Sequence, residues 1–167
     1  MTEQHPFKPF APVNSETLIL GSFPGKESTQ KLRDRDWFYC ANRNQFWKIM
    51  ELVYNKNLSS LDAKQQLLQE NKVAITDIIL SCERRGNNNK DTNLINKKYN
   101  RDAIYSILDS NPIKKILFTS KGVHQEFLEN FNMQLNIELI VLPSPSPIYR
   151  RLNLQDKAIE YKKHLKD

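Results

Sequence analysis

Four short apolar runs alternate along the chain with stretches in which apolar residues recur at helical spacing. The runs occupy residues 17–20, 73–80, 116–119 and 137–142. Because each run is continuous, it is typical of a strand buried on both faces of a parallel sheet. Helices are expected from about residue 45, over 60–70, 101–109 and 122–131, and after Asn153. This alternation predicts an α/β fold in which helices cover both faces of a parallel sheet.

The length of the chain and its few irregular segments favour one domain. Its 167 residues fit a single domain, residues 1–167, with one sizeable core. Residues 1–16 contain three prolines and little periodicity, so we expect an irregular N-terminal arm. The Asn-rich segment 87–96 is expected to be a long loop. Helix caps are expected at Ser60 or Asp62, at Asn100 and at Asn153.

Composition limits the cellular setting and the kinds of partner. No apolar run approaches the roughly 20 residues of a membrane span, and the N-terminus lacks a signal-peptide pattern, so we expect a cytoplasmic protein with no membrane partner. The two cysteines suggest a reducing compartment, and the three histidines are too scattered for a metal site. The net charge of +6 favours an anionic partner such as nucleic acid, although a basic surface that binds nothing is equally compatible.

Each predicted strand is followed by an unusual polar segment. These segments are GSFPG (21–25), SCERRG (81–86), SKG (120–122) and LPSPSP (142–147). In open parallel sheets, ligands bind at the carboxyl ends of the strands. The four segments are therefore expected to meet at one edge of the sheet and to form the functional site there.

The same segments carry a family resemblance. GSFPG, FYCANRNQFWKIM (38–50), SCERRG and LPSPSP resemble, in this order, the uracil-DNA glycosylase superfamily. Together with the N-terminal HPFKPF (5–10) they look most like its hypoxanthine-DNA (DNA-deoxyinosine) glycosylases, the branch called family 6. The resemblance implies a three-layer α-β-α sandwich with a central four-stranded parallel sheet. It also implies hydrolysis of the glycosidic bond of a deaminated base, hypoxanthine or uracil, in DNA, without a cofactor. We further expect a monomer.

The first motif is expected to build the base pocket. Turn glycines allow close backbone approach, which suits Gly21 and Gly25. Phe23 can stack on a flipped base, and the remaining pocket candidates are Pro24, Tyr39 and Asn42. Many relatives hold an Asn or Asp where this chain has Ser22 or Phe23, and neither of these is a competent base. The alternative is that the glycines and proline only turn the chain between a strand and a helix.

Asn44, in the Arg-Asn-x-Phe-Trp pattern of residues 43–47, is the main catalytic candidate. Ser22 is the second candidate. The Asn44 amide both donates and accepts hydrogen bonds, so it can hold a base or orient water. Asn is also a favoured helix cap, so capping alone, or both roles together, remain open.

The last motif is expected to grip DNA. Ser144 and Ser146 resemble the phosphate-gripping serines of the superfamily, on a loop stiffened by Pro145 and Pro147. Apolar residues that follow can fill the place of an extruded base, and arginines suit phosphates. The other DNA-binding candidates are therefore Ile148, Tyr149, Arg150, Ser120 and Lys121. A plain surface loop is the alternative.

Several charged groups are left without a settled role. Glu83 and Arg84 can act in the site or form a structural ion pair, and the basic stretch 84–101 can contact phosphates or be solvated. Asp77 lies inside a predicted buried strand, where we expect a structural role because an unbonded buried acid is costly. At the level of the whole protein, a damage-binding relative with weak catalysis and a small-molecule-binding α/β domain are the alternatives.

Overall fold

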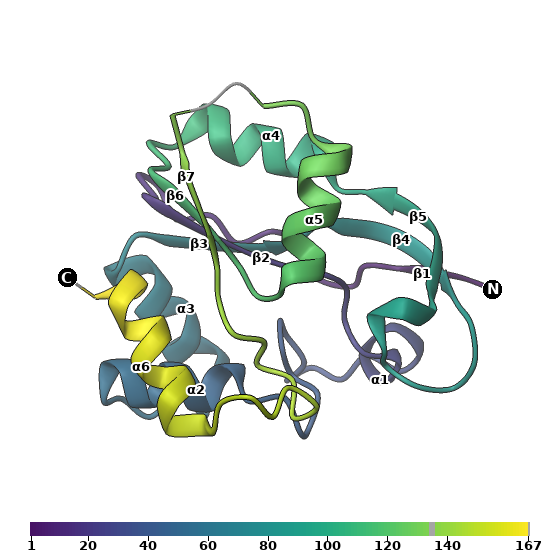
Figure 1. The fold of residues 1–167 in the computed structure, drawn as a ribbon, viewed down its shortest axis with the longest axis horizontal. Coiled ribbons are helices and arrows are strands. Elements are labelled where there is room, and N and C mark those ends of the chain that lie inside the picture. The colour runs from purple at the N-terminus through teal and green to yellow at the C-terminus, as the bar shows by residue number, and fades with distance from the viewer. Residues whose placement is uncertain (134–135, 167) are drawn as a thin grey trace.

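The computed structural model describes residues 1–133 and 136–166. Within them the main sheet has four strands, and Figure 1 shows how helices surround it. The strands lie in the order β3-β2-β6-β7, and all neighbours are parallel. Their bounds are β2 Thr17–Gly21, β3 Val73–Asp77, β6 Lys115–Phe118 and β7 Glu138–Val141. The expected α/β sandwich with a four-stranded parallel sheet is confirmed. Residues 134, 135 and 167 of the expected single domain lie outside the described residues.

Helices cover both faces of this sheet, as the continuous apolar runs predict. Leu18 and Leu20 pack in a core cluster on one face, whereas Ile19 between them packs in a second cluster on the other. Figure 1 shows α4 and α5 on the first side and α2, α3 and α6 on the second. These helices are α2 Phe46–Tyr54, α3 Leu61–Glu70, α4 Arg101–Ser110, α5 Lys121–Asn130 and α6 Leu154–Leu165. In the described part of the chain, no helix has the length and apolarity needed to cross a membrane.

Most helix starts follow the sequence signals. The side chain of Ser60 accepts a hydrogen bond from the Ala63 N–H at 3.1 Å, and that of Asn153 accepts one from Asp156 at 2.8 Å. Asn100 is the N-cap residue of α4, as expected, but its side chain makes no capping hydrogen bond. Its Nδ2 instead donates to Thr76 Oγ1 and to the Asp77 carbonyl, at 3.3 Å each. The Asn100 amide group is therefore oriented toward the buried end of β3 and not toward the first turn of α4.

A second, antiparallel sheet was not predicted. It has the order β1-β4-β5, with β1 Thr2–Gln4, β4 Ile79–Arg84 and β5 Leu94–Tyr99. The predicted strand 73–80 is therefore two strands that separate at Ile78, and the long loop shortens to residues 85–93, which include a 3-10 turn, η1, at Asp91–Asn93. The N-terminal arm is not irregular throughout, because residues 2–4 pair with β4.

The hairpin was missed because its strands carry few apolar residues. β5 buries Leu94 but reads Asn-Lys-Lys over 96–98, which resembles a solvated loop. A short helix after β2, α1 Lys26–Gln30, was not expected either. Both elements lie beside the carboxyl edge of the main sheet, so they enlarge the region in which a site can form (Figure 1).

Candidate active site

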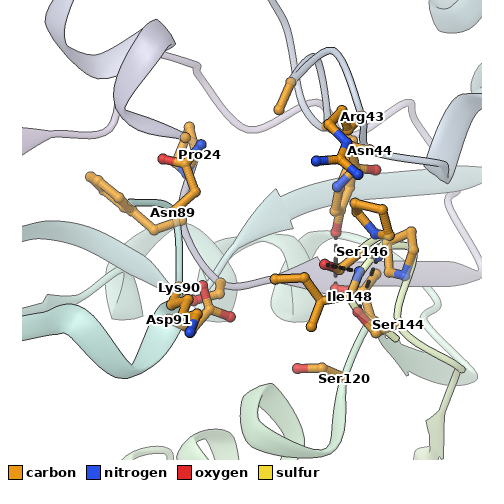
Figure 2. A pocket seen from close by; sticks show the side chains of 18 of the residues that line it. Pro24, Arg43, Asn44, Asn89, Lys90, Asp91, Ser120, Ser144, Ser146 and Ile148 are labelled. Atoms are coloured by element: carbon orange, nitrogen blue, oxygen red, sulfur yellow. Dashed lines mark hydrogen bonds between the residues drawn. The ribbon is translucent and has the colours of Figure 1, made fainter. Parts of the chain in front are cut away.

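A cavity of about 710 Å³ opens at the carboxyl edge of the main sheet. Three of the four strand-end segments line it, through residues 22–25, 119–120 and 144–149. The fourth segment, 81–86, does not. Asp77 at the end of β3 and residues 88–92 of the β4–β5 connection take its place. Figure 2 shows Asn89, Lys90 and Asp91 across the opening from Asn44, Ser146 and Ile148.

Most of the predicted site residues meet in this cavity. The residues that line it are Ser22, Phe23, Pro24, Gly25, Tyr39, Asn44, Ser120, Ser144, Pro145, Ser146, Pro147, Ile148 and Tyr149. Six predicted residues are not part of the lining: Gly21, Asn42, Lys121, Arg150, Glu83 and Arg84. Asn42, Lys121 and Arg150 are exposed outside it, so the structure does not bring Asn42 into the pocket.

Gly21 lies beneath the cavity and must lack a side chain. A Cβ atom at this position would come within 2.4 Å of both Asp77 Oδ1 and the Tyr39 hydroxyl. Tyr39 is fixed above it, because its ring stacks on Phe46 at 4.1 Å and its hydroxyl donates to Thr119 Oγ1 at 3.3 Å. Burial and the nearby Asp77 charge raise the pKa of Tyr39, which keeps the phenol neutral. The glycine thus lets a carboxylate and a phenol approach the same point.

Asp77 is held by a histidine from the N-terminal arm. His5 Nε2 donates to Asp77 Oδ2 at 2.7 Å, and both side chains are nearly buried. The structural role expected for Asp77 therefore has a physical basis. However, Asp77 also lines the cavity, and within residues 1–133 and 136–166 its Oδ1 has no hydrogen-bond donor. An acid inside an apolar run indicated in the sequence that residue 77 has a special role, but its partner His5 was not predicted.

The Asn44 amide is oriented by the start of α2. Its Oδ1 accepts a hydrogen bond from the Phe46 N–H at 2.9 Å. This bond identifies the oxygen and turns the Nδ2 group the other way. The N-cap residue of α2 is Gln45 and not Asn44, so Asn44 supports the helix start from one residue before the cap. Asn44 also lines the cavity, so this support and a role in the site are compatible. The arrangement makes Asn44 a hydrogen-bond donor toward a ligand.

Residues 143–149 form one side of the cavity, which we call the Pro-Ser wall. Ser144 Oγ accepts from the Ser146 N–H at 3.2 Å, and Ser146 Oγ accepts from the Ile148 N–H at 3.3 Å. A hydroxyl that accepts from the backbone still has its own hydrogen to donate. Both serines therefore present O–H donors on a loop whose shape is already set, and Ile148 beside them is 69% exposed.

Buried side chains support this wall from behind. The Tyr161 hydroxyl donates to the Pro143 carbonyl at 2.9 Å, and the Gln45 N–H donates to the Pro145 carbonyl at 2.8 Å. Lys157, only 1% exposed, donates from Nζ to Gln45 Oε1 at 2.7 Å and to the Ser146 carbonyl at 3.1 Å. Burial lowers the pKa of Lys157. Sequence reasoning missed this lysine, although it falls on the apolar face of α6 between Leu154 and Tyr161.

Residues 88–92 form the opposite side, which we call the Asn wall. Its contacts are exposed: Asn89 Oδ1 accepts from the Lys26 N–H at 2.9 Å, and Asn89 Nδ2 donates to Glu27 Oε2 at 3.0 Å. Asp91 faces the cavity from this wall. The pKa of Asp91 is raised to about 6, chiefly because burial disfavours the charged carboxylate, with the Asp77 charge adding to the effect.

Glu83 and Arg84 do not pair with each other. Arg84 instead forms a buried ion pair with Glu3 at 3.0 Å and donates to the Pro24 carbonyl at 3.1 Å. Burial acts to raise the pKa of Glu3, but hydrogen bonds from Arg84 and its neighbours outweigh it and the pKa is lowered. Glu83 accepts from Asn96 Nδ2 at 2.9 Å. Arg84 therefore has a structural role, but its partner is Glu3 and not the expected Glu83, and this ion pair holds the first motif against β1.

Comparison with known proteins identifies the family of this chain. A family model described as the uracil DNA glycosylase superfamily matches residues 7–166. The chain is 29% identical over 137 residues to a protein from Methanosarcina barkeri named hypoxanthine DNA glycosylase, covering 80% of this chain and 82% of that protein. A protein of the same name from Methanosarcina acetivorans is 28% identical over 142 residues, covering 84% of each chain. A solution NMR structure of a candidate uracil DNA glycosylase from Methanosarcina acetivorans matches with a TM-score of 0.73 at 23% identity, covering both chains completely.

Proposed function

This chain belongs to the uracil DNA glycosylase superfamily and is a DNA N-glycosylase, and we propose that it excises hypoxanthine, and uracil as a second substrate, from DNA. Both curated relatives are named for hypoxanthine. The cavity, at about 710 Å³, falls within the usual size range of small-molecule sites and accommodates a purine nucleoside. The observation that carries the proposal is the meeting of Asn44 with the Pro-Ser wall in this cavity.

The reaction requires the base to leave the duplex first. Enzymes that act on a base in DNA rotate the nucleotide out of the stack and bind it in a pocket. Water then adds to C1′ of the deoxyribose while the C1′–N bond breaks, and the base leaves with the bonding electrons. The sugar passes through an oxocarbenium-like state, so the protein must stabilise charge on the departing base.

Asn44 fits that task as a hydrogen-bond donor. Because its Oδ1 is engaged by the Phe46 N–H, its Nδ2 is the group available to a carbonyl oxygen or ring nitrogen of the base. A fixed donor that faces developing negative charge lowers the barrier without a general base. This role accounts for a first motif in which Ser22 and Phe23 replace the expected amide or carboxylate.

The remaining site residues suit the nucleotide around the base. Ser144 and Ser146 have O–H donors for phosphate oxygens, and Ile148 is exposed where an apolar side chain can fill the gap in the stack. Phe23 lines the cavity and can stack on the base. Arg150 and Lys121, outside the cavity, are proposed phosphate contacts. A monomeric state and a cytoplasmic location remain predictions.

A panel of duplex oligonucleotides tests the proposal. Each carries one hypoxanthine, uracil, xanthine or mismatched thymine, and alkaline cleavage reports abasic product after incubation with excess protein. Product is expected first from hypoxanthine. A folded protein that binds these duplexes and gives no product from any of them would contradict the proposal.

One alternative retains the fold and not the activity. The first motif lacks the usual Asn or Asp, which favours a damage-binding relative with weak catalysis. The same panel separates the two functions, because such a protein would bind the duplex with hypoxanthine more tightly than an undamaged duplex and release no base.

A further inference from the structure

Asp91 is a carboxyl group in the cavity that the proposed reaction has not yet used. It lies on the Asn wall, opposite Asn44, and contributes to the lining (Figure 2). The long apparent loop in the sequence hid it, because the β4–β5 hairpin is what brings residue 91 beside the end of β3. A carboxyl group and an amide donor therefore face one another across the space that a base would occupy.

The surroundings of Asp91 favour its protonated form. Asp77, with His5 behind it, raises the pKa of Asp91, and so does Glu126 on α5. Lys97 on β5 acts in the opposite direction, but its ammonium is paired with Glu126 at 2.8 Å. Tyr39 also lines the cavity, and burial keeps its phenol group neutral.

Two basic groups complete the set of charges around Asp91. Lys90 precedes it in the chain, and Arg43 lines the cavity on the opposite side. The pKa of about 6 leaves a minority of the free protein with this proton at pH 7. Phosphates of bound DNA add negative charge and would raise that fraction.

Ser22 gives an independent sign that this corner receives a ligand. Its Oγ atom is buried, and in the described part of the chain it forms no hydrogen bond of normal geometry. It still lies close enough to Asp91 to lower the pKa of that carboxyl somewhat. A buried hydroxyl without a partner is costly and uncommon, which is consistent with a site that a substrate completes.

We propose that Asp91 is the general acid of the glycosylase reaction and delivers a proton to a ring nitrogen of the departing purine. The proposal rests on the proposed excision of hypoxanthine and names a further catalytic residue for it. The geometry supports it because the carboxyl group faces the cavity from the wall opposite Asn44, beside the unpartnered hydroxyl of Ser22. Ser22, a catalytic candidate from the sequence, lies close enough to the carboxyl group to position the acid.

The proposed step balances without any additional reactant. As the C1′–N9 bond breaks, its electron pair goes to the base, and Asp91 transfers its proton to a purine nitrogen, so hypoxanthine leaves as a neutral molecule. Water forms the new bond to C1′ and loses one proton, which Asp77 can accept because it lines the cavity and its hydrogen bond to His5 uses the other oxygen, Oδ2. Proton exchange with solvent then returns both carboxyl groups to their starting states.

A pH–rate profile of the Asp91→Asn variant tests this step. Single-turnover rates are measured between about pH 5 and about pH 8.5 on a duplex with one deoxyinosine. The wild-type rate should be level at low pH and fall about tenfold per unit above a breakpoint at or above about pH 6, because the proton is lost. The variant should be at least about 100-fold slower at pH 6, and its profile should be flat.

Matched variants keep the result interpretable. Asp109→Asn removes the same charge from an exposed position on α4 and should reproduce the wild-type profile. Asp91→Glu retains a carboxyl group and should retain a descending limb at a lower rate. Binding to a duplex with a non-hydrolysable 2′-fluoro-deoxyinosine should change less than threefold in Asp91→Asn.

The outcomes separate this inference from the proposed function. An Asp91→Asn variant that keeps the wild-type rate, or the wild-type descending limb at a lower rate, overturns the acid role while excision stands. An Asp91→Glu profile without a descending limb overturns it as well. A wild-type protein that releases no hypoxanthine would overturn the proposed excision and the acid role together.

Discussion

The two walls of the cavity are built in different ways. The Pro-Ser wall is supported from behind by buried groups, namely Tyr161, Lys157 and the backbone of Gln45. The Asn wall is held by exposed amide and carboxylate contacts to α1. Exposed hydrogen bonds contribute little net free energy, whereas a buried network fixes one geometry.

This difference indicates a division of labour. The groups proposed to contact DNA, such as the serine hydroxyls, lie where buried side chains support them. Asp91 lies on the other wall, where it delivers a proton to a base that is already held. Substitutions behind the Pro-Ser wall should therefore have large effects, and substitutions of the amides in the Asn wall should have small ones.

Changes to the floor between the two walls should have the largest effect. In Gly21→Ala the new methyl group meets Asp77 Oδ1 and the Tyr39 hydroxyl, so one of them must move. We expect a loss of about 1–3 kcal/mol in the free energy of unfolding and a glycosylase rate at least about 100-fold lower. Chemical denaturation and single-turnover assays measure both.

Gly122→Ala is the control for that substitution. A Cβ atom at Gly122 meets nothing closer than Ser120 Oγ at 3.9 Å, and the residue lies in α5. This variant should retain the wild-type rate and be as stable or slightly more stable. If the two glycine variants had equal glycosylase rates and equal free energies of unfolding, the close approach at Gly21 would have no role in the site.

Removal of the buried support should have the next largest effect. Lys157→Met leaves Gln45 Oε1 and the Ser146 carbonyl without their donor. Release of the Pro-Ser wall should weaken binding to damaged DNA by about tenfold, which corresponds to about 1.4 kcal/mol. Fluorescence anisotropy measures the affinity, with Lys162→Met on the exposed side of α6 as the control for lost charge. Similar affinities for both variants would remove the distinction between the walls.

Asp91 should affect stability in a pH-dependent manner. Its folded-state pKa of about 6 lies above the ordinary 3.8, so the folded protein holds this proton more tightly than the unfolded chain does. The resulting stabilisation is complete below about pH 4 and lost as the pH rises through about 6. Asp91→Asn should therefore be more stable than the wild type at pH 7.5 and equal to it near pH 4. Residue 91 is exposed to solvent, which screens the carboxylate, so the expected difference is only about 1 kcal/mol. Urea denaturation at both pH values measures the free energies of unfolding. If Asp91→Asn were less stable than the wild type at pH 7.5, the environment assigned to Asp91 would be wrong.

The smallest effect is expected on the Asn wall itself. Asn89→Ala removes exposed hydrogen bonds to Lys26 and Glu27. Its free energy of unfolding should change by less than about 0.5 kcal/mol, and its glycosylase rate by less than about threefold. If Asn89→Ala lost as much affinity for damaged DNA as is expected for Lys157→Met, the site would depend on both walls to the same extent.

The sequence was sufficient for the main sheet because its strands are buried on both faces and leave uninterrupted apolar runs. It was insufficient for the hairpin, because β5 carries Asn96, Lys97 and Lys98 and looks like a loop. Asp91 was hidden for the same reason. Lys157 was missed because helical periodicity counts apolar residues, and a buried lysine interrupts the count although its stem packs like theirs.

Asn44 illustrates what a motif can and cannot define. Its residue type suggests both a cap and a catalytic amide, and only the bond from the Phe46 N–H determines which end of the amide remains for a ligand. Similarly, a buried acid at residue 77 predicts a partner, but no pattern in the sequence identifies His5, 72 positions away, as that partner.

The central claim is that Asn44 acts as a donor to the departing base, and the most direct test compares Asn44→Asp with Asn44→Ala in single-turnover excision of hypoxanthine. Asp retains an oxygen that accepts the Phe46 N–H, so the Asn44→Asp variant should keep wild-type stability, whereas Asn44→Ala should lose about 1 kcal/mol. Both variants lack the amide N–H, so both should excise at least about 100-fold more slowly than the wild type. A rate for Asn44→Asp close to that of the wild type, with only Asn44→Ala impaired, would show that Asn44 serves the helix and not the base.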